Sequence, residues 1–493
     1  MPDVLPPLLR IHEADTVAVA LCPLAAGEMV GTIVLREAVP QGHKVALQPH
    51  RTGDSVIKYG QRIGRATAPI EAGEHVHSHN LETALSGEIA YAPQLGEVSG
   101  VSDAVAASWQ GYLRDDGRAA TRNEVWILPT VGCVAATAEH VARAANSRHA
   151  GRIDGIHAFT HPHGCSQLGD DLAGTRAVLA GLAANPNAAG VLLLGLGCES
   201  NQLDALMEAV PAAVRGKLRI LSSQSAGDEV AEAAKLIDEL AEAASAAKRE
   251  ELPLSALTIG LKCGGSDGFS GLTANPLLGR LSERIAAAAG KVILTEIPEV
   301  FGAEQALLDR SANRQVFDAA AALINGFKRY YLDQGLPVSE NPSPGNIAGG
   351  ITTLEEKSLG AVQKAGLARL ADVIGYGEQV RRSELTMLGA PGNDAVSATA
   401  LVAAGANIIL FTTGRGTPLG FPVPTVKVAS NRSLAEAKGH WIDFDASQVL
   451  EHGTETTDSG FLAKVLAIAS GEPCAAERHD QRGIAIWKRS VTL

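Results

Sequence analysis

Apolar residues recur in two different patterns along the chain, and the change between them marks a boundary in the expected fold. Residues 12–95 contain short runs in which apolar and polar positions alternate, such as "TVAVALCPL" and "SVIKYGQRIGRA", each closed by Gly or another turn residue. Alternation with a period of two is typical of half-buried strands. The pattern predicts a small all-β domain over residues 1–95, followed by a linker at 96–112, where periodicity is weak and the residues are small and polar.

From Glu124 onward, continuous apolar runs alternate with Ala-rich helical segments, as in "EVWILPTVGC" followed by "ATAEHVARAANS". Strands that are apolar on both faces and are separated by helices indicate a parallel sheet covered by helices. The pattern resumes at "LTIGLKCGG" after a long Ala/Glu/Lys helix. Because single cores stop growing at roughly 250–300 residues, we expect an α/β body of parallel-sheet character in two parts, residues 113–250 and 251–493.

Composition and charge narrow the class of partner. The chain has 493 residues, 46% apolar and 19% charged, with a formal net charge of −12, which is typical of a globular protein and argues against nucleic acid or an anionic membrane as a partner. It contains no run of 18 apolar residues and no export signal, so we expect a cytoplasmic protein. The expected partner is a small molecule, and enzymes of this kind are often symmetric oligomers, which favours a homo-oligomer, a dimer in the simplest case.

Four of the six cysteines follow an apolar run and lie beside a glycine: Cys133, Cys165, Cys198 and Cys263. Ligands of open parallel sheets bind outside the carboxyl ends of the strands, so these thiols are expected at such an edge. Two interpretations stay open. The cysteines are either small buried apolar residues or thiolate ligands of an iron–sulfur cluster, although no C-x₂-C run supports a cluster.

The same turns carry polar side chains. "HPHGCSQLGDD" offers His163 and Gln167, and "GLGCESNQ" offers Glu199 and Asn201. An edge with so many acid, amide and imidazole groups suits a polyhydroxylated ligand. We expect His163 and Glu199 to take part in acid–base catalysis, and Gln167 and Asn201 to bind substrate hydroxyls.

If the ligand is an anion, an acidic protein must supply positive charge and backbone amides locally. Arginines and an amide precede the first α/β strand in "RDDGRAATRNE", a Gly-rich turn in "CGGSDGFSG" can form an anion-binding nest, and "FTTGRGTP" places an arginine between two glycines. The residues expected to bind the substrate at these places are Arg118, Arg122, Asn123, Ser266, Asp267, Arg415 and Lys427.

The stretch "GEHVHSHN" places His75, His77 and His79 at alternate positions. On a strand these side chains share one face at intervals of about 6.5 Å, so two neighbours can converge on one ion while the outer two cannot. Neutral imidazole suits Fe²⁺, Mn²⁺ or Zn²⁺. The sequence predicts a metal site of two histidines here, and the alternative is a polar edge strand.

Taken together, "RDDGRAATRNEVWILPTVGC", "HGCSQLGDD", "GLGCESNQ", "CGGSDGFSGLTANP", "TEIPEVFGAEQ", "NPSPGNIAGGITTLEEKSLG" and "FTTGRGTPLGFPVPTVK" resemble successive motifs of the altronate/galactarate dehydratase family of sugar-acid hydro-lyases. The resemblance covers nearly the whole chain. Its N-terminal part resembles the small β-clip SAF domain of this family. "HVHSHN" and the end of the chain are more similar to the altronate branch than to the galactarate branch, whereas "TVGCVAAT" departs from that branch by lacking Asn-Gly after the Val.

The resemblance implies conversion of D-altronate to 2-dehydro-3-deoxy-D-gluconate and water, a step of galacturonate breakdown that depends on Fe²⁺ or Mn²⁺. Such a reaction needs a base for the C2 proton and an acid for the leaving C3 hydroxyl, and a divalent ion stabilises the charge of the intermediate. The resemblance also draws attention to His43 and Lys44 in "GHK": His43 either completes the metal ligands or acts as the base, with Lys44 near the substrate carboxylate. Galactarate or another sugar acid as substrate, an iron–sulfur mechanism, and a non-catalytic sugar-acid binder remain as alternatives.

Overall fold

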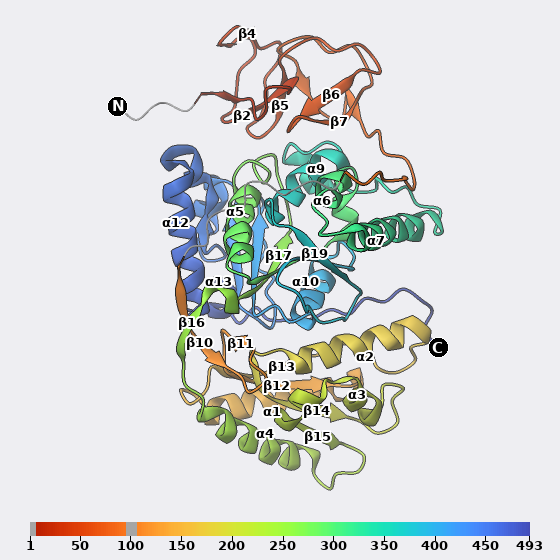
Figure 1. Ribbon diagram of the computed structural model, residues 1–493, viewed down its shortest axis with the longest axis vertical. Helices are drawn as coiled ribbons and strands as arrows, with labels where there is room; N and C mark the ends of the chain where they lie inside the picture. Colours follow the sequence, from red (N-terminus) through yellow and green to blue (C-terminus); the bar gives the residue numbers. More distant parts are fainter. Residues whose placement is uncertain (1–5, 95–105) are drawn as a thin grey trace.

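The computed structural model describes residues 6–94 and 106–493, which form three parts stacked along the long axis of the molecule (Figure 1). The N-terminal β domain lies at one end, the C-terminal α/β domain in the middle, and the second α/β domain at the other end. The expected fold class is therefore confirmed: a small β domain precedes an α/β body with parallel sheets in two parts. No helix of the described residues is long and apolar enough to cross a membrane.

The N-terminal domain is built from short antiparallel strands. A four-stranded sheet has the order β1-β2-β5-β8, a three-stranded sheet has the order β6-β7-β9, and β3 pairs with β4. Their bounds are β1 Leu8–Leu9, β2 Val17–Ala20, β3 Met29–Val30, β4 Ile33–Val34, β5 Lys44–Ala46, β6 Ser55–Lys58, β7 Gln61–Ala66, β8 His75–Val76 and β9 Leu81–Glu82. These strands bury an apolar core of their own around Leu24, Leu35 and Val45.

The expected strand across the alternating histidines is wrong beyond its first two residues. Strand β8 ends at Val76, because the Asn80 side chain accepts a hydrogen bond from the His77 amide at 2.9 Å and donates one to the His75 carbonyl at 2.9 Å. These two bonds close a turn. His77 and His79 therefore do not continue one face of a strand, and their positions are set by the turn.

The second domain contains a four-stranded parallel sheet of order β13-β12-β14-β15, flanked by four helices. The elements are β12 Glu124–Pro129, α1 Ala135–Arg148, β13 Gly155–Ala158, α2 Gly169–Ala184, β14 Ala188–Gly195, α3 Leu203–Ala209, β15 Leu218–Ser222 and α4 Glu229–Ser245, with 3₁₀ turns η1 Gly132–Val134 and η2 Ala212–Lys217.

A separate antiparallel sheet lies between the second and the C-terminal domain. It has the order β11-β10-β16, with β10 Ser108–Leu113, β11 Ala119–Ala120 and β16 Glu250–Pro253. Strand β10 thus occupies the end of the segment expected to be a linker, and residues 96–105 of that segment lie outside the described residues. The chain enters the second domain through β10 and leaves it through β16, so the two connections are paired with each other.

The C-terminal domain surrounds a seven-stranded parallel sheet of order β19-β20-β18-β17-β21-β22-β23. The strands are β17 Thr258–Cys263, β18 Lys291–Leu294, β19 Leu370–Ile374, β20 Glu384–Leu388, β21 Ile408–Thr413, β22 Thr425–Ala429 and β23 Phe444–Asp445. The helices are α5 Ala274–Ala287, α6 Glu304–Leu308, α7 Arg314–Leu332, α8 Pro344–Ala348, α9 Leu354–Ala361, α10 Asp394–Ala403, α11 Arg432–Ala437, α12 Val449–Ala469 and α13 Ala475–Arg478. The 3₁₀ turns are η3 Leu254–Ala256, η4 Ile297–Val300, η5 Val362–Ala365 and η6 Ala446–Gln448.

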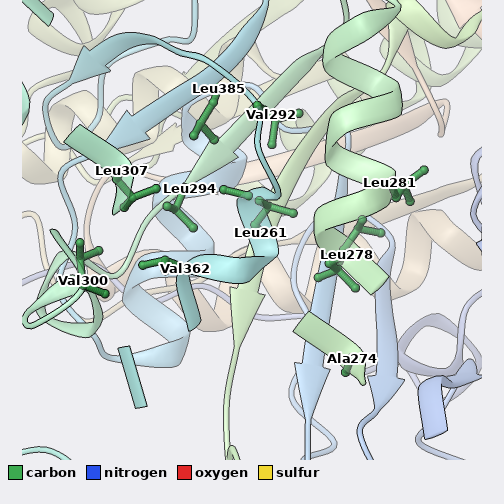
Figure 2. Close-up of a cluster of buried hydrophobic side chains, with 14 of the residues drawn as sticks. Leu261, Ala274, Leu278, Leu281, Val292, Leu294, Val300, Leu307, Val362 and Leu385 are labelled. Carbon is green, nitrogen blue, oxygen red and sulfur yellow. The ribbon is translucent and has the colours of Figure 1, made fainter. Parts of the chain in front are cut away.

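Buried leucine and valine side chains hold this sheet to its helices (Figure 2). This cluster includes Leu261 of β17, Leu294 of β18, and Leu278 and Leu281 of α5, and all four are nearly inaccessible to solvent. Burying each such side chain contributes about 1.5–3 kcal/mol. The carboxyl ends of the strands are therefore fixed on a rigid core.

The N-terminal domain covers the carboxyl edge of this seven-stranded sheet. The loop after β17 touches the turn before β5. A Cβ at Gly268 would lie 1.9 Å from the Gly42 carbonyl oxygen, so only glycine fits at this position. The Lys44 ammonium reaches across to the Gly350 carbonyl at 2.7 Å. Ligands of parallel sheets bind at this edge, so the contact between the two domains is the place to look for a site.

Candidate active site

A polar pocket of about 570 Å³ lies at the carboxyl edge of the seven-stranded sheet. Its charged lining residues are Glu299, Glu340, Lys357 and Asp394. The remaining lining residues are Gly264, Gly265, Tyr331, Asn341, Ser343, Asn346, Gly392, Asn393, Ala395 and Leu419. Pockets of this volume hold small organic ligands, and the preponderance of amide, hydroxyl and charged groups suits a sugar acid.

Three lysines and three carboxylates form a network under and beside this pocket. Lys262 of β17 binds the carboxylates of Asp394, at 2.6 Å, and of Glu296. Lys357 of α9 binds Glu299 at 2.8 Å, and Lys364 lies 3.5 Å from Glu296. The network therefore links two buried carboxylates to the pocket lining.

The pKa values of the Cys263 thiol and of the two glutamates in this network are shifted in different directions. Burial opposes the charge of Glu299, but Lys357, Lys262 and Lys364 outweigh it and lower its pKa to about 2. For Glu296 burial prevails and raises the pKa, and burial also raises the pKa of the Cys263 thiol to about 12. A carboxyl group with a raised pKa is suited to accept a proton near neutral pH. Glu296 also has a left-handed backbone with φ of 66°, a strain found at functional sites.

The sequence predicted no role for this network, although Glu296, Glu299 and Lys357 lie in the motifs that carry the family resemblance. Lys262 in "IGLKC" and Glu296 in "ILTEIPEV" are charged residues at the end of a buried apolar run, and buried charges are retained where they are paired. That signal marks the residues as unusual. It does not show that β17, the turn after β18 and helix α9 bring them together.

Four histidines of the N-terminal domain gather on the side facing the C-terminal domain. The ring centroids of His43, His75 and His77 are 5.0–5.1 Å apart, and His79 lies 5.5 Å from His75 and is exposed. His43 Nδ1 and His75 Nε2 are separated by 3.0 Å. Two imidazole nitrogens bound to one ion at 2.0–2.1 Å in tetrahedral geometry are about 3.3 Å apart, so this pair fits a shared ion.

One of these rings is oriented by a carbonyl group of helix α8. His77 Nε2 lies 3.0 Å from the Ile347 carbonyl oxygen, a contact that requires an N–H on that nitrogen and leaves the lone pair on Nδ1. Metal-binding histidines are commonly fixed in this way, with one nitrogen donating to a backbone carbonyl.

The histidines are also in the neutral form that binds metal. Burial, reinforced by the neighbouring histidines and Lys44, lowers the pKa of His75 to about 3, and burial with His77 and Lys44 lowers that of His43 to about 4. The donor set therefore fits a divalent transition-metal ion. The sequence predicted His79 as a neighbour of His75 and His77, but the structure places His43 closer. The His43 ring is 5.1 Å from His75 and 5.0 Å from His77, whereas the exposed His79 ring is 5.5 Å from His75.

A second group of metal-ligand types lies in the lysine network. Within residues 6–94 and 106–493, Cys263, Glu296 and Glu299 are the group of three whose ligand atoms all lie within 4.8 Å of one another. Lys364 Nζ is 2.7 Å from the Cys263 sulfur, and Lys262 and Lys357 already neutralise the two carboxylates. Three ammonium groups around the position oppose a cation there, so the histidine group is the better metal site.

Lys44 anchors the N-terminal domain to the C-terminal domain. Its ammonium donates to the Thr352 hydroxyl at 2.9 Å and to Glu356 at 2.8 Å, and Lys58 binds the other oxygen of the same carboxylate at 2.8 Å. All three charged groups are buried. Lys44 is therefore fully engaged in the contact between the two domains.

The candidate residues of the second domain support its loops. Thr130 and the amides of Leu196 and Gly197 donate to the Glu199 carboxylate. Gln167 accepts from the Gly164 amide at 3.0 Å, Asn201 accepts from Arg176 at 3.2 Å, and the His163 amide donates to His161 Nδ1 at 3.1 Å. These residues follow β13 and β14, which Figure 1 draws at the opposite end of the molecule from β5. The structure does not bring His163 and Glu199 together with His43 and Lys44.

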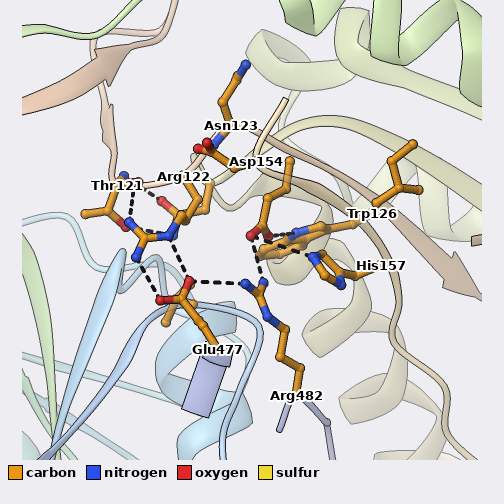
Figure 3. A network of polar contacts seen from close by, with 12 residues as sticks. Thr121, Arg122, Asn123, Trp126, Asp154, His157, Glu477 and Arg482 are labelled. Carbon is orange, nitrogen blue, oxygen red and sulfur yellow. Dashed lines mark hydrogen bonds and ion pairs between the residues drawn. The ribbon is translucent and has the colours of Figure 1, made fainter. Parts of the chain in front are cut away.

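The arginines before β12 join the second domain to the C-terminal domain (Figure 3). Arg122 binds both oxygens of Glu477 at 2.8 Å, and Arg482 binds Glu477 at 3.1 Å and Glu124 at 2.7 Å. Arg118 donates to the Ala184 carbonyl at 2.7 Å and pairs with Asp116, and Asn123 donates to the Ala244 carbonyl at 2.9 Å. These side chains stabilise the junction and are not part of the pocket lining.

Replacing Glu477 with Gln is expected to lower the free energy of unfolding by about 3 kcal/mol at neutral pH, because it leaves Arg122 and Arg482 buried without a counter-charge. The two arginines outweigh the opposing effect of burial and lower the pKa of Glu477 from 4.5 to about 2. Its contribution is fully present above pH 4.5 and declines as the pH falls toward 2. Urea unfolding followed by the fluorescence of Trp126, which donates to Glu124 at 2.8 Å, measures this difference.

An unchanged gap between wild type and Glu477→Gln at pH 7, 5 and 4 would contradict this assignment. The control is Glu239→Gln, which removes a half-exposed carboxylate 3.7 Å from Arg219 and should change the free energy of unfolding by at most about 0.5 kcal/mol.

The remaining candidates belong to the C-terminal domain but are not among the residues that line the pocket. Asp267 accepts from Ser430 at 2.7 Å and from Asn431 at 2.9 Å, and Ser266 accepts from Asn346 at 2.8 Å, so both hold loops. Lys427 is buried, donates to the Thr417 carbonyl at 3.0 Å, and has a pKa lowered by burial to about 8. Arg415 is exposed and lies close to helix α8. If Gly345 of that helix carried a Cβ, the Arg415 Nε would lie 3.5 Å from it.

Three family models match consecutive parts of the chain. They describe the altronate/galactarate dehydratase SAF domain at residues 6–84, the second domain of D-galactarate dehydratase/altronate hydrolase at 111–245, and the C-terminal domain of D-galactarate/altronate dehydratase at 254–492. The order of the models is that of the three parts of the structure.

Curated relatives match over nearly the full length. The chain is 47% identical to the altronate dehydratase of Bacillus subtilis (strain 168) and 45% identical to that of Escherichia coli (strain K12), in each case over 98% of this chain and 99% of the relative. It is 29% identical to the galactarate dehydratase (L-threo-forming) of Escherichia coli (strain K12), over 94% of this chain and 93% of the relative. These comparisons confirm the resemblance, and the protein belongs to the altronate/galactarate dehydratase family, with greater similarity to its altronate dehydratases than to this galactarate dehydratase.

Proposed function

We propose that this protein dehydrates D-altronate to 2-dehydro-3-deoxy-D-gluconate, using a divalent ion, Fe²⁺ or Mn²⁺, held by His43 and His75, whose Nδ1 and Nε2 atoms are 3.0 Å apart. The full-length identity of 45–47% to two altronate dehydratases carries the choice of reaction and substrate. The neutral histidine group facing the C-terminal domain supports the metal. The polar pocket at the carboxyl edge of the seven-stranded sheet supports a small hydroxy acid as ligand.

The side chains of the pocket suit the two proton transfers of a dehydration. The bound ion would supply Lewis-acid stabilisation of the charge that develops on the substrate carboxylate when the C2 proton leaves. Lys357 and Asn346 offer donors to substrate oxygens. Asp394 lines the pocket and shares the Lys262 ammonium with Glu296, so Lys262 holds the Asp394 carboxylate in place beside a bound substrate.

Product analysis with a panel of sugar acids tests the proposed function. The protein is incubated with D-altronate, galactarate and D-mannonate in the presence of Fe²⁺ or Mn²⁺, and 2-keto-3-deoxy acids are quantified. We expect product from D-altronate at a much higher kcat/KM than from the other two. Binding of D-altronate without product would identify a non-catalytic binder, and product from galactarate alone would assign the other substrate of the family.

Replacing Lys357 with Met is expected to lower kcat/KM for D-altronate roughly 30-fold, since a hydrogen bond to a charged group contributes about 2 kcal/mol and each 1.4 kcal/mol is tenfold. Lys357 is the ammonium in the pocket lining, and its loss also leaves Glu299 without its nearest partner. Steady-state kinetics measure the effect. The control variant is Lys235→Met on the exposed face of α4, and equal rates for both variants would remove Lys357 from the site.

A further inference from the structure

Three exposed thiols lie at the carboxyl edge of the second domain sheet. Cys133 follows β12, Cys165 follows β13 and Cys198 follows β14, and these strands are neighbours in the order β13-β12-β14. Cys263 does not belong with them, because it is buried at the end of β17 in the other sheet. The sheet thus brings three of the four cysteines of this pattern to one edge.

The loops that carry the three cysteines are bonded to one another. The Gly132 amide donates to the His163 carbonyl at 2.9 Å, and the Asn201 amide donates to the Gly164 carbonyl at 2.9 Å. A Cβ at Gly164 would lie 2.0 Å from the Thr130 carbonyl oxygen, so the backbones are in direct contact. With neighbouring strands about 4.8 Å apart, the thiols sit on three touching loops of one edge.

The local sequence lets the three cysteine loops pack closely against their neighbours. A glycine precedes each cysteine, and Gly164 and Gly197 have φ of +100° and +131°, which other residues rarely adopt. Gln224 Nε2 donates to the Cys198 sulfur at 3.5 Å. Hydrogen bonds to sulfur are a feature by which proteins adjust iron–sulfur centres.

The spacing of the sulfurs disfavours one small ion. Thiolates around a single tetrahedral metal at about 2.3 Å lie about 3.8 Å apart, whereas no group of three cysteines with sulfurs within 4.8 Å occurs in the part of the chain that the structure describes. An iron–sulfur cluster is larger, and each thiolate binds a separate iron. Three thiolates on one edge are suited to bind three irons of a four-iron cluster, and the fourth iron then takes a ligand other than cysteine.

We propose that Cys133, Cys165 and Cys198 bind a [4Fe–4S] cluster through three thiolate–iron bonds. The cluster enters preassembled on external thiolate ligands: at three irons the bond to the external thiolate breaks as the bond to a cysteine sulfur forms, the displaced thiolate leaves with the proton of the cysteine, and no electron is transferred in the step. The fourth iron then binds an oxygen ligand from solvent or a small hydroxy acid. This site goes beyond the proposed function, because it is separate from the histidine group at the other end of the molecule.

Anaerobic reconstitution of the full-length protein with ferric iron, sulfide and a thiol tests the proposal. After desalting, we expect roughly four iron and four acid-labile sulfide per chain, with a broad visible absorption that dithionite bleaches. The triple variant C133S/C165S/C198S should lose all of the sulfide and the absorption. Cys22→Ser, which removes an exposed thiol of the N-terminal domain, should keep both, and circular dichroism checks that all variants fold.

Sulfide retained by the triple variant at the wild-type level would overturn the proposal, as would wild-type protein that binds no sulfide. A disulfide between two of the three cysteines, detected by mass spectrometry after anaerobic isolation, would also overturn it. The variant His75→Ala separates this proposal from the proposed function: it should lose the sulfide-free ion and D-altronate turnover while it keeps the sulfide.

Discussion

Replacing His75 with Ala is expected to lower the rate of D-altronate dehydration by about two to three powers of ten, since Lewis-acid stabilisation contributes several kcal/mol and each 1.4 kcal/mol is tenfold. His75 is the centre of the histidine group, 5.1 Å from the rings of both His43 and His77. Its removal breaks the 3.0 Å nitrogen pair that fits an ion. Iron analysis of the desalted variant and kcat with excess Fe²⁺ measure the two consequences.

The neighbouring histidine provides the matched control. His79 is exposed and its ring is 5.5 Å from His75, so His79→Ala should retain most of the bound iron and activity. A distant variant, His452→Ala on an exposed part of helix α12, should behave as wild type. If His75→Ala bound iron and turned over D-altronate as wild type does, the histidine group would not be the metal site.

Replacing Glu356 with Gln is expected to lower the free energy of unfolding by about 4–5 kcal/mol, because it leaves the buried ammonium groups of Lys44 and Lys58 without their shared carboxylate. Burial opposes the charge of Glu356, but the two lysines outweigh it and lower its pKa to about 2, so the group is ionised at neutral pH. Lys44 also bonds to Gly350 and Thr352. The variant should therefore loosen the contact between the N-terminal and C-terminal domains.

Two readouts separate this effect from a general loss of stability. Chemical denaturation gives the change in free energy, and hydrogen exchange under native conditions should show faster exchange in helix α9 and in β5 than in the second domain. The exposed-carboxylate variant Glu239→Gln serves again as control. A Glu356→Gln protein within about 0.5 kcal/mol of wild type, with unchanged exchange in α9, would contradict the anchoring role.

The sequence predicted the architecture because strand periodicity is a local property. The buried run "AGVLLLGLG" corresponds to β14, Ala188–Gly195, and "LTIGLKC" corresponds to β17, both in parallel sheets. The alternation of histidines was also local, but it gave the wrong geometry. The side chain of Asn80 closes a turn there, and its two bonds override the alternating pattern.

The candidate site was harder to predict because its members are far apart in the chain. Lys44 was singled out for its neighbour His43, and the sequence gives no indication that its partner is Glu356, 312 positions away. The network of Lys262, Glu296 and Lys357 likewise depends on how the strands and α9 meet. Spacing did place three of the four cysteines at one edge, because the carboxyl ends of neighbouring parallel strands coincide.

The most direct test of a metal-dependent dehydration at the contact between the SAF domain and the C-terminal domain is turnover of D-altronate by metal-stripped protein before and after Fe²⁺ is added. Product is followed by nuclear magnetic resonance. The account predicts negligible product from the stripped protein, formation of 2-dehydro-3-deoxy-D-gluconate once Fe²⁺ is restored, and no such recovery in His75→Ala. Equal turnover with and without Fe²⁺, or no product under either condition, would contradict it.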